Sequence, residues 1–366
     1  MEPQPHTDVS DVVGALTAYL ATKRALCASD ADFLAQLLKH RMLLPAAWAI
    51  PESDPLAFTL DVVSKQLARD LQSAPTLIDA ANQALAALEA AGLHPLVLKG
   101  HAFAQTFYPR AELRRATDDD LLISPAERLR GHHALLAAGY SARTFGALHR
   151  ICGQAVYTKR IGAETHMIDL HWQLGNTFEF FDRFDFAALQ ADSRPIPGSL
   201  IKGRQLAPWH ALVHASMHYF TEPVEWERSD LVLLDVALIA RTLDRDGWQK
   251  ATSAAHSSGL SATLSAALDR VEKLFCIRPS AEYRVALTEA ARSEPAASLL
   301  KNRPTRDTVF APLRTSHPLR TKVTYAFFQL LPPQAYMRAN YAINNGAPAL
   351  LRAYAARLLK GVRYLL

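Results

Sequence analysis

The sequence predicts an α+β protein in which a short mixed β-sheet is embedded between mostly helical N- and C-terminal lobes. Apolar residues recur at three- and four-residue spacing over residues 9–92 and again from residue 209 onward, which is typical of amphipathic helices. Between these regions, short apolar runs and segments of alternating polarity predict strands. Hydrophobic residues make up 49% of the 366 residues and charged residues 20%, the composition of a folded globular chain.

Residues 1–92 are expected to form a helical N-terminal lobe. Helical periodicity covers residues 12–27, 30–50, 55–74 and 74–92. Ser29 and Asp30 are residue types favoured at a helix N-cap, and Gly92 is the type expected just past a helix C-terminus.

Residues 93–205 are expected to form the α/β core. The run HPLVLKG (94–100) predicts a buried strand, a helix is expected over 100–108, and TDDDLLIS (117–124) predicts a second strand. Pro125 is expected to open a helix that Gly139 ends. Residues 140–145, 154–160 and 165–172 then alternate in polarity as strands do.

The remainder is expected to be helical: a lobe over 206–300 that closes the active-site cleft, and a basic segment over 301–366. Helical patterns cover residues 209–220, 230–244 and 259–275. The basic segment holds eleven Lys and Arg residues against one acidic residue, Asp307, so its net charge is about +10. The rest of the chain carries about −5, which gives the net charge of +5 for the whole chain. Such asymmetry indicates an anionic partner for this segment.

Cysteine usage and hydropathy narrow the class of protein. The three cysteines, Cys27, Cys152 and Cys276, are odd in number and form no CxxC pair, so a disulfide framework and a zinc ribbon are not expected. The first residues lack a basic segment followed by an apolar run, and no apolar stretch reaches the ~18–20 residues that a membrane span needs. We therefore expect a cytoplasmic protein.

Carboxylates on two predicted strands provide the main chemical signal. Side chains alternate along a strand, so Asp118 and Asp120 share one face and Asp119 lies on the other. On the segment THMIDLHW, Asp169 and His171 also share a face. If the two strands are neighbours, three carboxylates converge on one site and provide the oxygen ligands that suit Mg²⁺ or Mn²⁺. Acidic doublets at strand ends are common without a metal, so the paired aspartates alone are a weak signal.

A candidate phosphate-binding turn strengthens the prediction of a metal site. Lys99 and Gly100 end a predicted strand and open a predicted helix, where backbone N–H groups and a cation can hold phosphates. Carboxylates that bind metal beside such a turn are suited to phosphoryl or nucleotidyl transfer.

These motifs together carry a family resemblance. The run LVLKGHAFAQTFYP, then R(x)3DxDLLI, a GY after a helix and IDLHW resemble the uncharacterised nucleotidyltransferase family of the polymerase-β-type superfamily. The resemblance covers about residues 94–175, with weaker similarity to about residue 250. It implies a minimal nucleotidyltransferase fold, an NTP donor, an acceptor that the sequence does not identify, and a divalent cation, Mg²⁺ or Mn²⁺.

The resemblance also implies roles for individual residues. Asp118, Asp120 and Asp169 correspond to the catalytic, metal-binding carboxylates. Arg114 corresponds to an arginine that contacts phosphate, and Arg115 is the alternative for that contact. The nucleotide-binding positions carried over are Lys99, Gly100, His101, Arg114 and Arg115. Two departures bear on triphosphate binding: His101 stands where the superfamily usually has Ser or Gly, and Asp119 replaces a usually apolar residue.

Histidines on a predicted helix provide a secondary signal. His210, His214 and His218 recur every four residues, but an HxxxH pattern without the Glu of a zincin is more typical of helix packing than of a zinc site. The resemblance indicates that this helix faces the pocket, so His214 is a secondary candidate, as is His171.

The C-terminal residues 350–366 form a basic amphipathic pattern. On a helical wheel, the basic residues fall within roughly 140° of arc and the apolar ones lie opposite. Such a helix either lies on an anionic surface, here the inner face of a membrane, or packs its apolar stripe on the protein. Nucleic acid is not expected as a partner, because no recognised nucleic-acid-binding module is present.

Two other functions compete with nucleotidyl transfer. A DxD motif also serves glycosyltransferases, in which a cation bridges the diphosphate of a sugar nucleotide, but the long nucleotide-binding sheet expected before such a motif is missing from the sequence. A non-catalytic nucleotide-binding or membrane-associated scaffold is the other alternative, and the intact carboxylates Asp118, Asp120 and Asp169 count against it.

Overall fold

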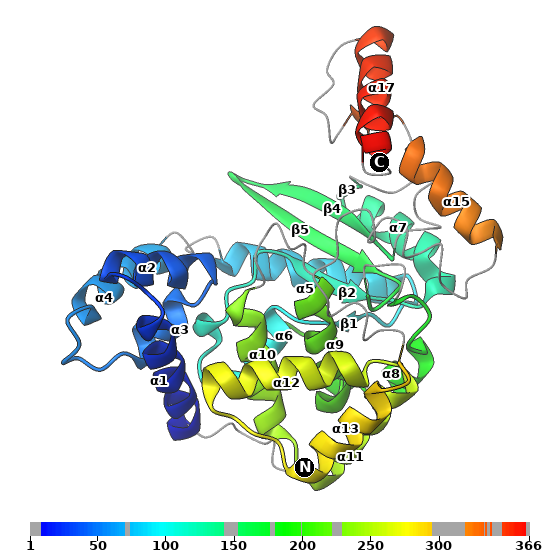
Figure 1. The fold of residues 1–366 in the computed structure, drawn as a ribbon. Helices are drawn as coiled ribbons and strands as arrows, with labels where there is room; N and C mark the ends of the chain where they lie inside the picture. Colours follow the sequence, from blue (N-terminus) through cyan, green and yellow to red (C-terminus); the bar gives the residue numbers. More distant parts are fainter. Residues whose placement is uncertain are drawn as a thin grey trace.

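The computed structural model describes residues 9–294 and 319–363, apart from 70–73, 143–152, 176–179, 199, 222–228, 333, 335–336 and 339–345. It confirms the α+β class: one mixed sheet lies among helices that come from both sides of it in the sequence (Figure 1).

The sheet in the described residues has seven strands in the order β3-β4-β5-β2-β1-β7-β6. β2 pairs in parallel with β5 and β1 in parallel with β7, and the other pairs are antiparallel. The strands are β1 (Leu96–Val97), β2 (Asp119–Leu122), β3 (Ser141–Ala142), β4 (Gln154–Ile161), β5 (Glu164–His171), β6 (Arg194–Pro195) and β7 (Arg204–Gln205).

Helices precede, connect and follow the strands. The N-terminal ones are α1 (Val9–Ala25), α2 (Asp30–Lys39), α3 (Leu43–Ala49), α4 (Ala57–Arg69) and α5 (Ala74–Ala90). Within the sheet region lie α6 (His101–Phe107), α7 (Arg128–Ala137) and α8 (Phe186–Asp192), with 3-10 turns η1 (Ala111–Leu113) and η2 (Pro125–Glu127). The rest are α9 (Pro208–Thr221), α10 (Asp230–Thr242), α11 (Arg245–Ser257), α12 (Ser261–Phe275), α13 (Ala281–Ala291), α15 (Leu319–Leu330) and α17 (Ala347–Arg363).

Two apolar clusters cover the two faces of the sheet. One unites α5 and α7 with alternate strand residues such as Leu121, Ile168 and Leu170. The other unites Leu98 and Leu122 with α6, the N-terminal helices and the helices from α9 to α12. Strand side chains alternate between faces, so the residues next to Leu121 and Leu170 in sequence point to the face that the second cluster covers. Asp120 and Asp169 lie on this face.

The single helix expected over residues 30–50 is wrong, because the chain breaks it into α2 and α3. Arg41 has a left-handed φ of 59° at the break. A continuous helix would place the Pro45 ring against the carbonyl of Arg41 and would lack a hydrogen bond there, whereas a new start at Leu43 puts Pro45 in a first turn, where it is tolerated. The freed carbonyl of His40 accepts the Ser229 hydroxyl at 3.0 Å.

In the part of the chain that the structure describes, none of the helices combines the length and the apolar character needed to cross a bilayer.

Candidate functional site

The parallel pairing of β2 with β5 brings the predicted carboxylates together. Asp120 lies directly opposite Asp169 in the register of the two strands. Ligand atoms of Asp120, Asp169 and His171 all lie within 4.8 Å of one another. The sheet therefore builds a compact group of two carboxylates and one imidazole, which we call the carboxylate cluster.

Asp118, which the sequence pattern pairs with Asp120, lies just outside this cluster, and His171 is the third member of the cluster. Asp118 precedes the first residue of β2, is half-buried and accepts a hydrogen bond from the Thr117 hydroxyl at 3.1 Å. His171 is buried, and its Nε2 is 3.0 Å from Asp120 Oδ1. Asp118 is still close enough for the charge of Asp120 to add to burial in raising its pKa.

The two carboxylates of the cluster have opposite electrostatic environments. Burial alone would raise the pKa of Asp120, but Lys99 and His171 hold it well below its usual value. Burial raises the pKa of Asp169 to about 6, and the charges of Asp120 and Asp118 add to this effect. Asp169 Oδ2 accepts a hydrogen bond from Gln154 Nε2 at 2.8 Å. Asp169 Oδ1 is buried and has no hydrogen-bond partner among the described residues.

Lys99 connects the cluster to the helical layer. Its Nζ lies 3.2 Å from Asp120 Oδ1 and 3.3 Å from His218 Nε2 on α9. Gly100, which follows it, has φ +58°, and a Cβ added there would lie 3.3 Å from the Cβ of Ala116. Glycine is therefore required by the backbone conformation and by the close approach to the segment that leads to Asp118.

The histidines of α9 divide between two surroundings. His214 and His218 stack with ring centroids 6.3 Å apart on the side of Lys99, which agrees with the prediction that this helix faces the site. Burial and the charge of Lys99 lower the pKa of His214 to about 3, so its ring is neutral. His210 instead lies 2.9 Å from Asp192.

Arg114, predicted as a phosphate contact, forms a buried ion pair. Its Nε and Nη2 donate to the two carboxylate oxygens of Asp235 on α10 at 3.0 and 2.8 Å. The Tyr108 hydroxyl donates to the same carboxylate at 2.8 Å. The pair therefore ties the segment before β2 to the helical lobe. The neighbouring Arg115 is exposed.

The two departures from the superfamily pattern, His101 and Asp119, contact each other. Asp119 points to the face opposite Asp120, as the alternation predicts, and its Oδ1 lies 3.0 Å from His101 Nδ1. Its Oδ2 lies 2.7 Å from His166 Nε2, and His166 Nδ1 lies 2.6 Å from the Tyr140 hydroxyl. Burial would raise the pKa of Asp119, but the two histidines hold it below its usual value. The His101 side chain thus holds the turn at Gly100 against β2, on the face of the sheet opposite Asp120.

A double-mutant cycle should detect this contact. We expect His101→Ala and Asp119→Asn to couple by about 1 kcal/mol or more in the free energy of unfolding, because each removes the same partly buried, charge-assisted contact. The measurement is urea-induced unfolding of the wild type, both single variants and the double variant. Additive single effects would contradict the contact.

Several residues of the site gave no signal in the sequence. Gln154 reaches the site through its hydrogen bond to Asp169, and His166 supports it through its contacts with Asp119 and Tyr140. An isolated Gln or His on an otherwise regular strand has no pattern that marks it, whereas the four-residue histidine spacing did mark His214 and His218 on α9.

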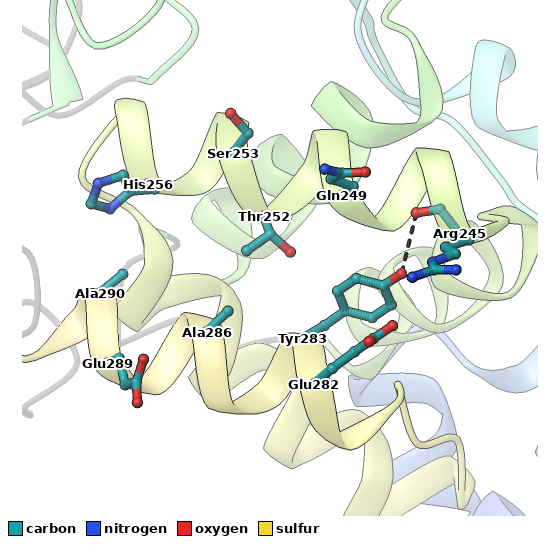
Figure 2. Close-up of a pocket in the computed structure, with 10 residues that line it drawn as sticks. All are labelled: Arg245, Gln249, Thr252, Ser253, His256, Glu282, Tyr283, Ala286, Glu289 and Ala290. Carbon is teal, nitrogen blue, oxygen red and sulfur yellow. Dashed lines mark hydrogen bonds between the residues drawn. The ribbon is translucent and has the colours of Figure 1, made fainter.

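A surface pocket of about 670 Å³ lies elsewhere, between α11 and α13 (Figure 2). Its lining mixes Arg245 and His256 with Glu282 and Glu289, and the Tyr283 hydroxyl donates to the Arg245 carbonyl at 3.2 Å. It shares no lining residue with the carboxylate cluster.

Comparison with known proteins adds one match. A family model described as an uncharacterised nucleotidyltransferase matches residues 28–276, a range that contains the sheet, the carboxylate cluster and the helices from α2 to α12. No curated protein matches the chain.

Proposed function

Because the chain belongs to this uncharacterised nucleotidyltransferase family, we propose that it moves a nucleoside monophosphate from an NTP to a hydroxyl or amine of an acceptor and releases pyrophosphate. The observation that carries the proposal is the register of Asp120 with Asp169, which places two carboxylates and His171 beside the ammonium group of Lys99. We assign the site to the polymerase-β type of metal-dependent transferase.

The residues present fit a divalent cation, Mg²⁺ or Mn²⁺. Asp169 Oδ1 and His171 Nδ1 are buried and lack hydrogen-bond partners among the residues that the structure describes, a condition that is costly unless a ligand satisfies them. Asp120, Asp169 and His171 would hold the cation, with Asp118 as a further oxygen ligand at the rim. When bound, the cation neutralises and orients phosphate oxygens and polarises the reacting phosphorus centre.

The side chains around the cluster have separate roles in this reaction. Lys99 binds triphosphate oxygens, with the exposed Arg115 as a second cation. Arg114, engaged by Asp235, positions the segment that carries Asp118. The acceptor's oxygen or nitrogen forms a bond to the α-phosphorus, the bond from that phosphorus to the β-bridging oxygen breaks, and pyrophosphate leaves with the electron pair. The Asp169 carboxylate, whose pKa burial raises to about 6, takes the acceptor's proton.

The predicted division of the chain at residues 92, 205 and 300 is part of the proposal. In it, the lobe over 206–300 covers the site, supported by the contact of His218 on α9 with Lys99. The placement of the reaction in the cytoplasm is likewise proposed.

Calorimetry tests the function. Each of the four NTPs and a UDP-sugar is titrated into wild-type protein with Mg²⁺ or Mn²⁺ and with EDTA. We expect an NTP to bind only with the cation, and Asp118→Asn/Asp120→Asn to lose that binding because both variants remove charge from the metal site. The charge-matched control Asp61→Asn/Asp246→Asn, which alters two exposed helical ion pairs, should bind as the wild type does.

Two results would overturn the proposal. Selective binding of the UDP-sugar would indicate a glycosyltransferase, and an absence of binding to any nucleotide would favour the scaffold function.

A further inference from the structure

The first described helix of the C-terminal segment presents an apolar stripe to solvent. Leu319, Val323, Phe327 and Leu330 on α15 follow one another at spacings of four, four and three residues, so they share one face of the helix. Their exposed fractions lie between 52% and 75%. Soluble proteins rarely expose a contiguous apolar patch of this kind, and such patches mark surfaces that meet another molecule.

The last helix extends this surface. Leu351 and Leu358 on α17 lie two turns apart on one face, next to Leu359, and all three are exposed, Leu351 and Leu359 by 68% and 67%. α15 and α17 contact each other, and the Tyr354 hydroxyl donates to the Pro332 carbonyl between them. In Figure 1, α17 projects beyond the rest of the ribbon. The predicted helix is therefore present, but much of its apolar face is not packed on the described part of the protein.

The charge of the same segment selects the partner. From residue 319 to the end, the chain has seven basic residues and no acidic one: Arg320, Lys322, Arg338, Arg352, Arg357, Lys360 and Arg363. Like charges of this density oppose pairing with a second copy of the segment, and a purely polyanionic partner leaves the apolar stripes exposed. An anionic lipid surface satisfies both features, because it offers negative headgroups above an apolar layer.

We propose that α15 and α17 form a docking surface for an anionic lipid bilayer. The two helices lie in the plane of the interface, their apolar stripes enter the boundary between headgroups and acyl chains, and the basic side chains stay at the headgroups. This surface is independent of the carboxylate cluster, so it recruits the protein to a membrane whether or not nucleotidyl transfer is its reaction.

Vesicle flotation of the full chain tests the proposal. Wild-type protein should float with phosphatidylcholine vesicles that contain about 30% phosphatidylglycerol, and less with phosphatidylcholine alone or at high salt. Val323→Asp/Phe327→Asp should weaken this binding by on the order of tenfold or more, because it puts charge into the apolar stripe. The control Phe58→Asp alters a residue on α4 that is 78% exposed and should bind as the wild type does.

Analytical ultracentrifugation distinguishes the alternative occupant. Equal flotation of wild type and Val323→Asp/Phe327→Asp would overturn the proposal. So would a wild-type dimer that ignores vesicles and that the same variant converts to a monomer, since the stripe would then be a self-association surface. Unchanged thermal unfolding of the variant confirms that a loss of flotation reflects the surface and not misfolding.

Discussion

Asp235→Ala is expected to lower the free energy of unfolding by about 3–5 kcal/mol, the largest loss of stability that we predict for a single substitution. Asp235 is buried and accepts both donors of the Arg114 fork as well as the Tyr108 hydroxyl. Truncating it leaves a guanidinium that is itself only 8% exposed without its counter-charge, and an uncompensated buried charge costs far more than the pair gains. Urea-induced unfolding followed by circular dichroism measures the change.

Two further variants separate the charge effect from the loss of packing. Arg114→Met/Asp235→Asn removes both charges at similar volume while the Asn oxygen can still accept from Tyr108, and should recover most of the stability, whereas Asp61→Ala, at an exposed ion pair with Lys65, should cost less than about 1 kcal/mol. A value for Asp235→Ala within about 1 kcal/mol of wild type would contradict the buried pair. The double variant also tests Arg114 as a phosphate contact, since retained NTP affinity would exclude that role.

The sequence predicted the strands of the site because their signals are local. β2 and β5 each combine an apolar run with alternating charge, so the faces of Asp118 to Asp120 and of Asp169 could be assigned before any pairing was known. Their parallel pairing is a long-range property, because β5 follows β4 in a hairpin and only then meets β2. The expected convergence was therefore conditional, and the structure meets the condition for Asp120 and Asp169.

The partners of buried charges could not be predicted in the same way. Arg114 was expected to contact phosphate because it matches the arginine of the family pattern four residues before Asp118, whereas its partner Asp235 lies 121 residues away on a helix. Asp119 and His101 were departures from a family pattern until the fold placed them 3.0 Å apart. In both cases the deciding energy is the desolvation of a charge, which depends on the tertiary environment and not on local sequence.

The short strands and the helix break show a different limit. β6 and β7 have two residues each, too few for alternation to be recognised, and they exist because they complete the sheet beside β1. The break between α2 and α3 could have been predicted from Pro45. Proline is tolerated in the first turn of a helix but not in its interior, where a single helix over residues 30–50 would place it.

The carboxylate cluster implies opposite effects of Asp169→Asn with and without metal. In EDTA, the substitution should stabilise the protein by about 1 kcal/mol or more, because it removes a buried negative charge close to Asp120 and Asp118 while the Asn oxygen can still accept from Gln154. With Mn²⁺ at about one hundred times its dissociation constant, wild type should gain about 2.7 kcal/mol and the variant little. The order of the two melting temperatures should therefore invert between the two conditions.

The pH dependence provides the control for this inversion. Burial raises the pKa of Asp169 to about 6 in the folded protein, above its ordinary value, so the cost of its ionisation is fully present above pH 6 and is lost as the pH falls toward the ordinary value. The advantage of Asp169→Asn in EDTA should accordingly shrink between pH 7.5 and pH 5. Differential scanning fluorimetry across both pH values and both metal conditions measures it. A wild type that melts above Asp169→Asn in EDTA at pH 7.5 would show that the carboxylates do not repel one another. A wild type that Mn²⁺ leaves unchanged would show that they do not form a metal site, because a cation that binds the folded state must raise its stability.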